Sequence, residues 1–361
     1  MDLRIIDDYS SSSDEDIIEF LIMTLPNAKQ YRIRLDVFNY FSDEEFKERY
    51  RFCKETVIFI SEKIGVQVIN DNRGKPLDKL EQILIVLRFY TTGSFQNVVA
   101  DFIKVHKSTV CRIIRRISQK LAALHPRFIK MPQNHELNQE KHNFFRVGNF
   151  PDVIGCVDCT HIKIKSPGGP DSKLYKNKEG FFSINVQAIC NSSLAFAEMT
   201  AHWKGSIPSS TIFNSSAIRL KFEKGEFPNC FLLGDSGYPC QSYLLTPVLN
   251  PQTEAECRYN IAHNKTRNCI ERTFEVWKRR FSCLSLGLRT RLETTLDIII
   301  ATAVLHNIAI QKNDEYEFDG DNISPVQEAG SFQPIAAADE INETPNSQFA
   351  ARNHIIQTSF N

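Results

Sequence analysis

The chain has 361 residues, 42% of them hydrophobic, which is enough for one large hydrophobic core or two ordinary ones. Its 43 basic and 43 acidic residues balance, but the charges are segregated. Residues 1–19 carry −6, residues 313–361 carry −8, and residues 20–312 carry +14. A basic body between acidic ends favours a polyanion-binding protein, and an ordinary solvated surface is the alternative.

The cysteines and the hydropathy argue against two classes of protein. Ten cysteines are scattered singly through apolar segments, which is typical of reduced thiols and not of a small disulfide-stapled secreted protein. No basic segment followed by an apolar one opens the chain. The longest apolar stretch, 298–310, is interrupted by His306 and Asn307 and is shorter than the roughly 20 residues that span a bilayer. We expect neither secretion nor membrane insertion.

Both ends of the chain are predicted to lack a fixed structure. Residues 1–37 contain Ser10–Ser13 beside three consecutive acids, and we expect a mobile acidic segment with a phosphorylation patch. Residues 313–361 are acidic and rich in Asn, Pro and Ala, and we expect a disordered tail.

The region 38–150 is predicted to be all helical, because its apolar residues recur at helical spacing. Within it, Ser94 can cap a helix that begins at Phe95 and breaks at 104–107, and Ser108 can cap a second helix through Leu121. Two helices joined by about four residues predict a helix-turn-helix over 94–124.

The second of these helices has the composition of a helix that binds DNA. Its apolar stripe is Val110, Ile113, Ile114, Ile117 and Leu121. The candidate nucleic-acid contacts that project from its other side are Lys107, Arg112, Arg116 and Lys120. The alternative is an amphipathic helix whose basic face is only solvated.

The region 151–312 has a different texture. Apolar strand-like runs at 153–164, 181–190, 194–203 and 230–233 are separated by turn residues, and helical spacing returns at 264–284 and 293–311. Three successive strands, a helix, another strand and more helices predict an α/β fold with a mixed sheet flanked by helices.

Three carboxylates in this region are candidate metal ligands. Asp158 interrupts an apolar strand, Asp235 follows the end of another, and Glu271 lies on a predicted helix. A buried carboxylate is costly unless it is paired or binds a metal. Carboxylates that converge from two strands and a helix can hold two Mg²⁺ or Mn²⁺ ions for phosphodiester cleavage. Each acid alone is weak support, because an Asp at a strand end can simply cap the next helix.

Cysteines and histidines offer competing sites. Cys156 and Cys159 have the CxxC spacing of a zinc or redox site near His161, but no second CxxC follows, and we expect both to pack as apolar residues. A nucleophilic pair of Cys159 and His306 has no support from spacing. His161 and Lys163 could touch phosphate, although strand alternation places them on the face opposite Asp158.

At these residues the sequence resembles the PIF/Harbinger family of DDE transposases, especially the domesticated nucleases derived from them in animals. The similar stretches are 92–96, 155–162, 183–188, 234–238, 267–272, 278–281 and 305–308, and the resemblance spans roughly residues 50 to 310. It implies a ribonuclease-H-like fold, Mg²⁺- or Mn²⁺-dependent nuclease chemistry and a nuclear location. It also implies that Asp158, Asp235 and Glu271 form the DDE triad. The family's transposases work with a separate Myb-like protein that helps them bind DNA and enter the nucleus.

The sequence departs from this family at one position. The family carries a further acid in a Gly-Ser-x-x-Asp-Ser motif, and Gly205–Ser210 places Ser209 there. A neutral hydroxyl is a weaker ligand, so we expect reduced metal affinity or turnover. This substitution keeps open a second hypothesis, a domesticated, catalytically inactive DNA-binding or scaffolding protein.

The leading hypothesis is a metal-dependent endonuclease acting on double-stranded DNA by a two-metal mechanism, with a Myb-like partner. Lys278 and Arg280 are further candidate phosphate contacts, and Asn268 and Arg272 are expected to orient the glutamate helix or the substrate. The basic trio 278–280 lies in a presumed folded helix, so we expect nuclear import with the partner, with the cytoplasm as a second location. A third reading, an unrelated cytosolic α/β protein, predicts no salt-dependent affinity for DNA.

Overall fold

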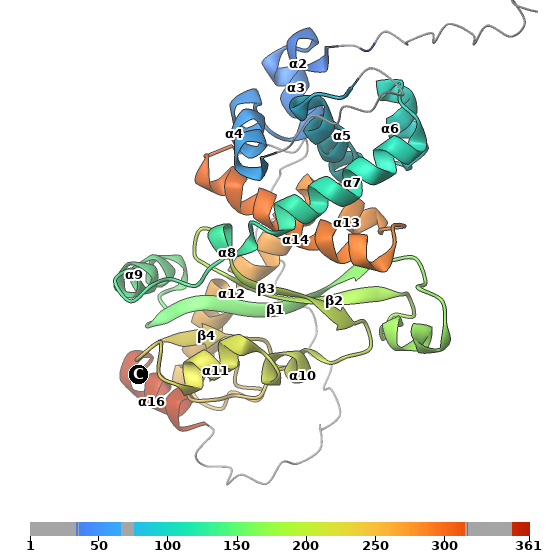
Figure 1. Ribbon diagram of the computed structural model, residues 1–361. Coiled ribbons are helices and arrows are strands. Elements are labelled where there is room, and N and C mark those ends of the chain that lie inside the picture. Colours follow the sequence, from blue (N-terminus) through green and yellow to red (C-terminus); the bar gives the residue numbers. More distant parts are fainter. Residues whose placement is uncertain (1–33, 35, 66–75, 315, 317–348) are drawn as a thin grey trace, which may run out of the picture.

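The computed structural model describes residues 34, 36–65, 76–314, 316 and 349–361 (Figure 1). Most of the predicted mobile N-terminal segment and most of the predicted disordered tail therefore lie outside the described residues.

A five-stranded mixed sheet forms the centre of the molecule, in the order β3-β2-β1-β4-β5. Strands β1, β2 and β3 are antiparallel neighbours, whereas β4 runs parallel to β1 and β5 runs parallel to β4. The strands are β1 (Val153–Lys163), β2 (Ser183–Cys190), β3 (Phe196–Lys204), β4 (Phe231–Leu233) and β5 (Leu244–Leu245). Every residue of β2 is buried, so both faces of the sheet are covered. The predicted α/β class with a mixed sheet flanked by helices is confirmed.

Helices surround this sheet. Those that precede it are α2 (Val37–Tyr40), α3 (Asp43–Tyr50), α4 (Lys54–Ile64), α5 (Lys79–Thr92), α6 (Gln96–Ile103), α7 (Lys107–Ala122), α8 (His125–Phe128) and α9 (Leu137–Gly148). Those that follow β1 are the 3-10 helix η1 (Pro170–Tyr175), α10 (Ser209–Asn214), α11 (Ala217–Glu223), α12 (Glu254–Arg280), α13 (Ser282–Leu286), α14 (Leu292–Gln311) and α16 (Ala350–Ser359).

The two helices of the predicted helix-turn-helix begin at slightly different residues than predicted. Phe95, not Ser94, occupies the N-cap of α6 and provides no side-chain cap. His106, not Ser108, caps α7, and its Nδ1 accepts a hydrogen bond from the Ser108 N–H at 3.2 Å. Three residues, 104–106, connect the two helices. The two predicted helices are present, each shifted by one or two residues.

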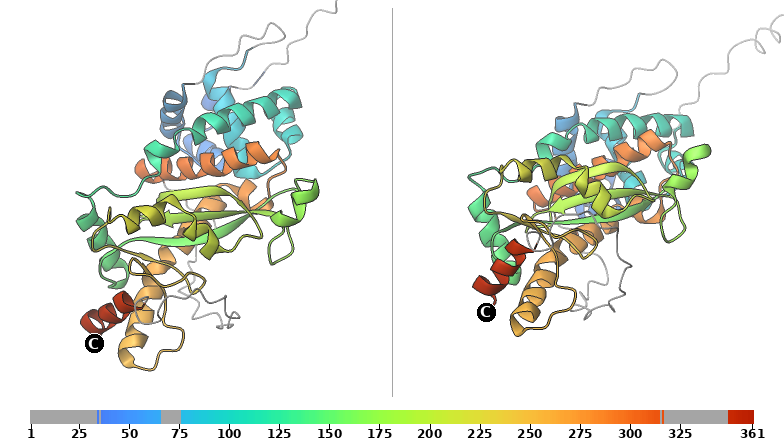
Figure 2. Two further views of the ribbon diagram at one scale, coloured as in Figure 1. Left: turned by 60° about the horizontal axis from the view of Figure 1, so that its bottom comes forward. Right: turned by 90° about the horizontal axis from the view of Figure 1, so that it is seen from below.

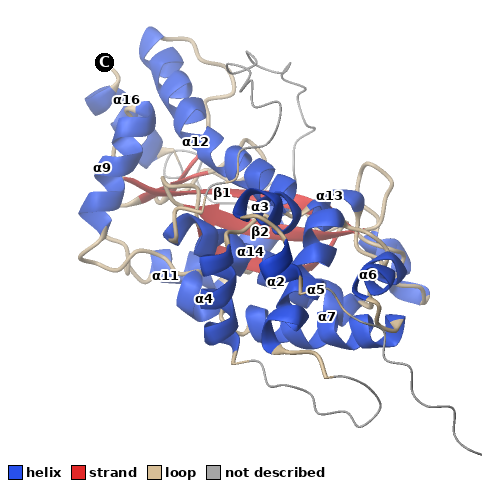
Figure 3. Cartoon of the chain, turned by 90° about the horizontal axis from the view of Figure 1, so that it is seen from above, coloured by secondary structure: helices blue, strands red, loops and turns tan. Residues whose placement is uncertain are grey.

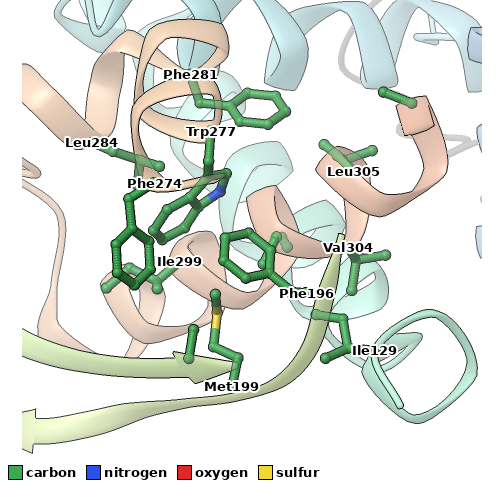
Figure 4. Close-up of a cluster of buried hydrophobic side chains, with 14 of the residues drawn as sticks. Ile129, Phe196, Met199, Phe274, Trp277, Phe281, Leu284, Ile299, Val304 and Leu305 are labelled. Carbon is green, nitrogen blue, oxygen red and sulfur yellow. The ribbon is translucent and has the colours of Figure 1, made fainter. Parts of the chain in front are cut away.

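Two hydrophobic clusters cover the two faces of the sheet. The smaller cluster packs α10 and α11, through Phe213, Ile218 and Phe222, against β1, β2 and β4. On the other face, Phe196 and Met199 of β3 lie against Phe274 and Trp277 of α12 and against α14 (Figure 4). Helix α14 passes the length and composition test for a membrane span, but 72% of its most apolar window is buried within the protein.

The larger cluster continues from the sheet into the N-terminal helices. It includes residues from Phe41 to Phe360, and α14 lies between α7 and β3. Figure 2 shows α7, α14 and the sheet as successive layers, and Figure 3 shows α3 in front of β1 and β2. All five residues of the predicted apolar stripe of α7 are buried. The larger cluster therefore includes residues on both sides of residue 150.

The end of the chain departs from the predicted disorder. Residues Ala350–Ser359 form helix α16, which packs against α12. Phe360 is 7% exposed and lies against Phe150 and Tyr259, and its carbonyl accepts a hydrogen bond from Arg258 Nε at 2.8 Å. The prediction of a disordered tail is thus wrong for residues 349–361, because their aromatic and aliphatic side chains find a site on α12.

Candidate functional site

Asp158 lies near the middle of β1, on the face that α12 covers. It is opposite Ala188 in the antiparallel pairing of β1 with β2. Two residues further along, Thr160 shares this face and its Oγ1 accepts a hydrogen bond from Lys278 Nζ of α12 at 2.6 Å. The predicted alternation of β1 is therefore correct, and Asp158 points toward the helix that carries Glu271.

Asp235 follows β4, the strand that runs parallel to β1. Cys156 of β1 pairs with Leu233 of β4. Asp158 and Asp235 each come two residues after this pair, so they lie at the same level of the sheet. The Gly237 N–H donates to Asp235 Oδ1 at 3.0 Å, which fixes the carboxylate in the turn after the strand. Asp235 is half-buried.

Arg267 connects the predicted acids and was not predicted to have a role in the site. Its Nη1 donates to Asp158 Oδ2 at 3.2 Å, and its Nη2 donates to Glu271 Oε1 one helical turn away. The Arg267 side chain is only 16% exposed. The available sequence signal was the i,i+4 spacing of Arg267 and Glu271 on one helix face.

The electrostatics show that the three carboxylates share one environment. Burial raises the pKa of Asp158 to about 6, and the charge of Asp235 adds to this increase. The positive charge of Arg267 and a hydrogen bond from the Cys159 N–H at 2.7 Å oppose it in part. Glu271 raises the same pKa further. Each of the other two predicted acids therefore acts on Asp158.

The three carboxylates also affect the pKa of Arg267. Burial acts to lower the pKa of its guanidinium, but the negative charges of Glu271, Asp158 and Asp235 outweigh burial and raise that pKa. Arg267 thus contacts two of the predicted acids, and the charge of the third also acts on it.

The donor set matches a hard divalent cation in its chemistry. All three side chains are carboxylates, which suit Mg²⁺ and Mn²⁺ better than zinc. Among the described residues, no group of three or more His, Cys, Asp and Glu side chains is spaced to hold a metal ion directly. In this conformation the Arg267 guanidinium bonds an oxygen of Asp158 and an oxygen of Glu271. A metal that used these oxygens would compete with Arg267 for them.

Ser209 begins α10 and lies close enough to Cys159, the residue after Asp158, to affect the pKa of its thiol. Burial raises the pKa of the Cys159 thiol to about 12, and contacts with Ser209 and Tyr238 oppose this increase only in part. A thiol with that pKa is a poor nucleophile at neutral pH.

The competing histidines lie elsewhere. His306 Nε2 pairs with the Leu194 carbonyl at 2.8 Å, and burial lowers the pKa of this histidine to about 4. His161 Nδ1 pairs with Ser183 Oγ at 3.0 Å. Lys163 lies over the ring of Phe181. His161 and Lys163 therefore belong to the face of β1 opposite Asp158, as predicted.

The candidate DNA contacts on α7 fall into two groups. Lys107 and Arg112 are exposed. Arg116 is half-buried and donates to Gln82 Oε1, and Lys120 Nζ donates to the Ile64 carbonyl at 3.3 Å. The exposed pair is therefore better placed to reach a ligand than the two residues that hold neighbouring helices.

A cavity of about 200 Å³ lies beside the start of α7. Its walls come from residues 93–97, from residues 287–290, and from Phe89, Lys107 and Cys283. Phe95 is 62% exposed, and the Arg289 guanidinium lies 4.5 Å from the centre of its ring. The stretch 92–96 that resembles the Harbinger family thus contributes to this cavity.

The remaining candidates on α12 have different environments. Arg280 is 5% exposed and donates to the carbonyls of Arg51 at 2.7 Å and Asp314 at 3.0 Å, so the predicted phosphate contact is corrected to a role inside the fold. Lys278 is half-buried and bonded to Thr160 in the site itself. Asn268 is half-buried and Arg272 is exposed, on the two sides of Glu271 in sequence.

Comparison with known proteins identifies the class to which this sheet and acid cluster belong. Residues 157–307 match the family model described as DDE superfamily endonuclease, and this range contains all three acids. The chain is 34% identical over 275 residues to the Bos taurus protein named "Putative nuclease HARBI1", covering 75% of this chain and 78% of that protein. The chain belongs to this Harbinger transposase-derived family of DDE proteins.

More distant relatives are also similar. The Xenopus laevis protein with the same name is 29% identical over 314 residues, 84% of this chain and 88% of that protein. An Arabidopsis thaliana protein named "Protein ALP1-like" is 26% identical over 265 residues, 68% of this chain and 64% of that protein. No solved structure matches the chain.

Proposed function

We propose that the protein is a divalent-metal-dependent endonuclease acting on double-stranded DNA, with a ribonuclease-H-like catalytic fold of DDE transposase descent. The observation that carries this proposal is that Arg267 bonds both Asp158 and Glu271, while the charge of Asp235 acts on Asp158 and on Arg267. The mixed sheet flanked by helices supports the fold assignment.

In this proposal Asp158, Asp235 and Glu271 hold Mg²⁺ or Mn²⁺. When bound, two such ions activate the attacking water and stabilise the leaving oxygen of a phosphodiester. Asp158 and Asp235 are fixed by neighbouring parallel strands, so the sheet sets their separation. Glu271 is 54% exposed, so the site opens to solvent on the α12 side, and DNA approaches there.

The proposal also covers DNA binding, cellular location and a partner protein. Lys107 and Arg112 of the α6–α7 helix pair bind DNA phosphates, and Arg272 orients the substrate beside Glu271. The protein acts in the nucleus with a Myb-like DNA-binding partner. The excess of 41 basic over 27 acidic residues in 20–312 supports a polyanionic ligand.

Nicking of supercoiled plasmid by the purified full chain tests the activity. We expect relaxation in Mg²⁺ or Mn²⁺, none in EDTA, and none with Asp235→Asn. Glu275→Gln is a matched control, because Glu275 lies one turn after Glu271 on α12 and pairs with Arg279. Cleavage that survives Asp235→Asn would contradict the proposed site.

A second candidate function is a catalytically inactive DNA-binding protein, which Ser209 favours because a hydroxyl replaces the family's further acid at the start of α10. This function predicts duplex binding that weakens steeply with salt, no cleavage with or without the partner, and equal binding by triad variants. Ser209→Asp separates the two functions, because gain of metal-dependent nicking would identify a retained but weakened nuclease site.

A further inference from the structure

Arg267 is shared by two of the three proposed metal ligands. Its two terminal nitrogens reach Asp158 Oδ2 and Glu271 Oε1, so one guanidinium ties β1 to α12. Among the ion pairs of the described residues, Asp158 and Glu271 have no partner other than Arg267. The nearby Lys278 is directed instead to Thr160.

Arg267 and a divalent cation would need the same atoms. A carboxylate oxygen that accepts a charge-assisted N–H bond at 3.2 Å presents that lone pair to the guanidinium. The guanidinium also places one positive charge beside these oxygens, at the position where a divalent metal ion would place two positive charges. Binding of the metal therefore weakens the two ion pairs and brings a divalent cation close to a like charge in a partly buried site.

We propose that Arg267 is a positioning residue that competes with the divalent metal for these two oxygens and thereby sets the metal concentration at which the site loads. This inference rests on the proposed nuclease function, because it takes Asp158, Asp235 and Glu271 to be the metal ligands. Arg267 keeps the carboxylates together by screening their mutual repulsion, and it must swing away from them when the metal enters. Its long side chain starts one turn from Glu271, whose side chain is 54% exposed, so solvent lies on that side of the ion pair.

Metal affinity distinguishes this role from a simple structural tie. If Arg267 only joined β1 to α12, its removal would destabilise the protein equally with and without metal and would leave metal affinity unchanged or weaker. If Arg267 competes, removal frees two ligand oxygens and one like charge, so the metal binds more tightly. The instability caused by three facing carboxylates is then relieved by the metal.

The test is Mn²⁺ binding to the full chain, followed by electron paramagnetic resonance of free Mn²⁺, without DNA and therefore without turnover. We expect Arg267→Gln to bind Mn²⁺ about tenfold or more tightly than wild type. Arg267→Lys keeps the charge but cannot bridge two carboxylates with one ammonium, so we expect an intermediate affinity. Arg279→Gln is the matched control, since it removes an i,i+4 pair with Glu275 on the same helix.

Thermal unfolding in EDTA and in Mn²⁺ gives a second readout. We expect Arg267→Gln to melt below wild type in EDTA and to gain more from Mn²⁺ than wild type does. Unchanged or weaker Mn²⁺ binding by both Arg267 variants would overturn the inference while leaving the proposed function standing, provided that wild-type binding is lost in Asp235→Asn. Binding that is indifferent to Asp235→Asn in every background would overturn the proposed function as well. If Arg267→Gln does not fold, Arg267→Lys decides in the same way.

Discussion

The Cys53 N–H donates to Asp314 Oδ2 at 2.8 Å, which joins the start of α4 to the residues just after α14. Lys47 Nζ lies 3.2 Å from the other carboxylate oxygen of Asp314, and Arg280 donates to its backbone carbonyl. The Asp314 side chain is 1% exposed. The N-terminal helices are thus tied by buried polar contacts to the end of the sheet-containing region.

Replacement of Arg280 by methionine should destabilise the whole protein. The buried guanidinium bonds the carbonyls of Arg51 and Asp314, and its loss leaves both acceptors in a dry environment. We expect a loss of about 2–4 kcal/mol in the free energy of unfolding. Urea unfolding measures this change, with Arg279→Met as a control on the same helix.

The same Arg280 variant tests the correction of its predicted DNA contact. If Arg280 acts only inside the fold, the folded variant should bind duplex DNA with wild-type affinity and salt dependence. A variant that keeps wild-type stability but loses DNA affinity would restore the phosphate-contact hypothesis for this residue.

The sequence predicted the mixed sheet because the strands are marked by local patterns. Apolar runs with turn residues located the strands, and period two correctly assigned Asp158 and Thr160 to one face. One feature of the core is nonlocal and could not be predicted from the sequence. Helix α14 has nearly continuous apolar character, so periodicity could not show that it packs on α7 as well as on β3.

Lys107→Ala and Arg112→Ala should each weaken DNA binding without changing stability. Both residues are exposed on α7, and loss of a phosphate contact lowers the slope of log affinity against log salt by about 0.9. Fluorescence anisotropy at several salt concentrations measures the slope. Arg127→Ala is the charge-matched control, because Arg127 is exposed on α8. Equal slopes for all three variants and wild type would show that α7 is only a solvated amphipathic helix.

Phe360→Ala should destabilise the protein although residue 360 lies in a segment whose composition predicted disorder. Its ring is buried against Phe150 and Tyr259. Truncation of a buried phenylalanine costs about 3–5 kcal/mol, and we expect the lower half of that range at a chain end. Differential scanning calorimetry measures the effect, and Gln357→Ala is an exposed control on α16. Equal melting temperatures for both variants would mean that α16 frays from α12 in solution.

The missed features of the tail and the site have a common physical cause. Composition averages hid three apolar residues, Ile355, Ile356 and Phe360, inside an acidic tail, and the sequence could not show that α12 covers them. Arg267 was visible as an i,i+4 partner of Glu271, but its second contact with Asp158 depends on how α12 crosses β1. The sequence at Arg280 indicated a surface base, because sequence cannot show that the carbonyls of Arg51 and Asp314 accept its hydrogen bonds inside the fold.

Glu198 of β3 should make stability fall as pH rises through the acid range. Burial raises the pKa of its carboxyl from 4.5 to about 7, and Lys221 lowers it only in part. Among the described residues, Glu198 Oε2 is buried without a hydrogen-bond partner. Between pH 4.5 and 7 the native state therefore binds more protons than the unfolded state, so the folded protein loses stability as pH increases.

The Glu198→Gln variant has no carboxyl at this position and does not lose stability in this way. As pH rises from 4.5 to 8, we expect its free energy of unfolding to increase relative to that of wild type by up to about 3 kcal/mol. Urea unfolding at the two pH values, with the exposed Glu226→Gln as control, measures the difference; parallel pH profiles for wild type and Glu198→Gln would show that the carboxylate stays solvated in the folded protein.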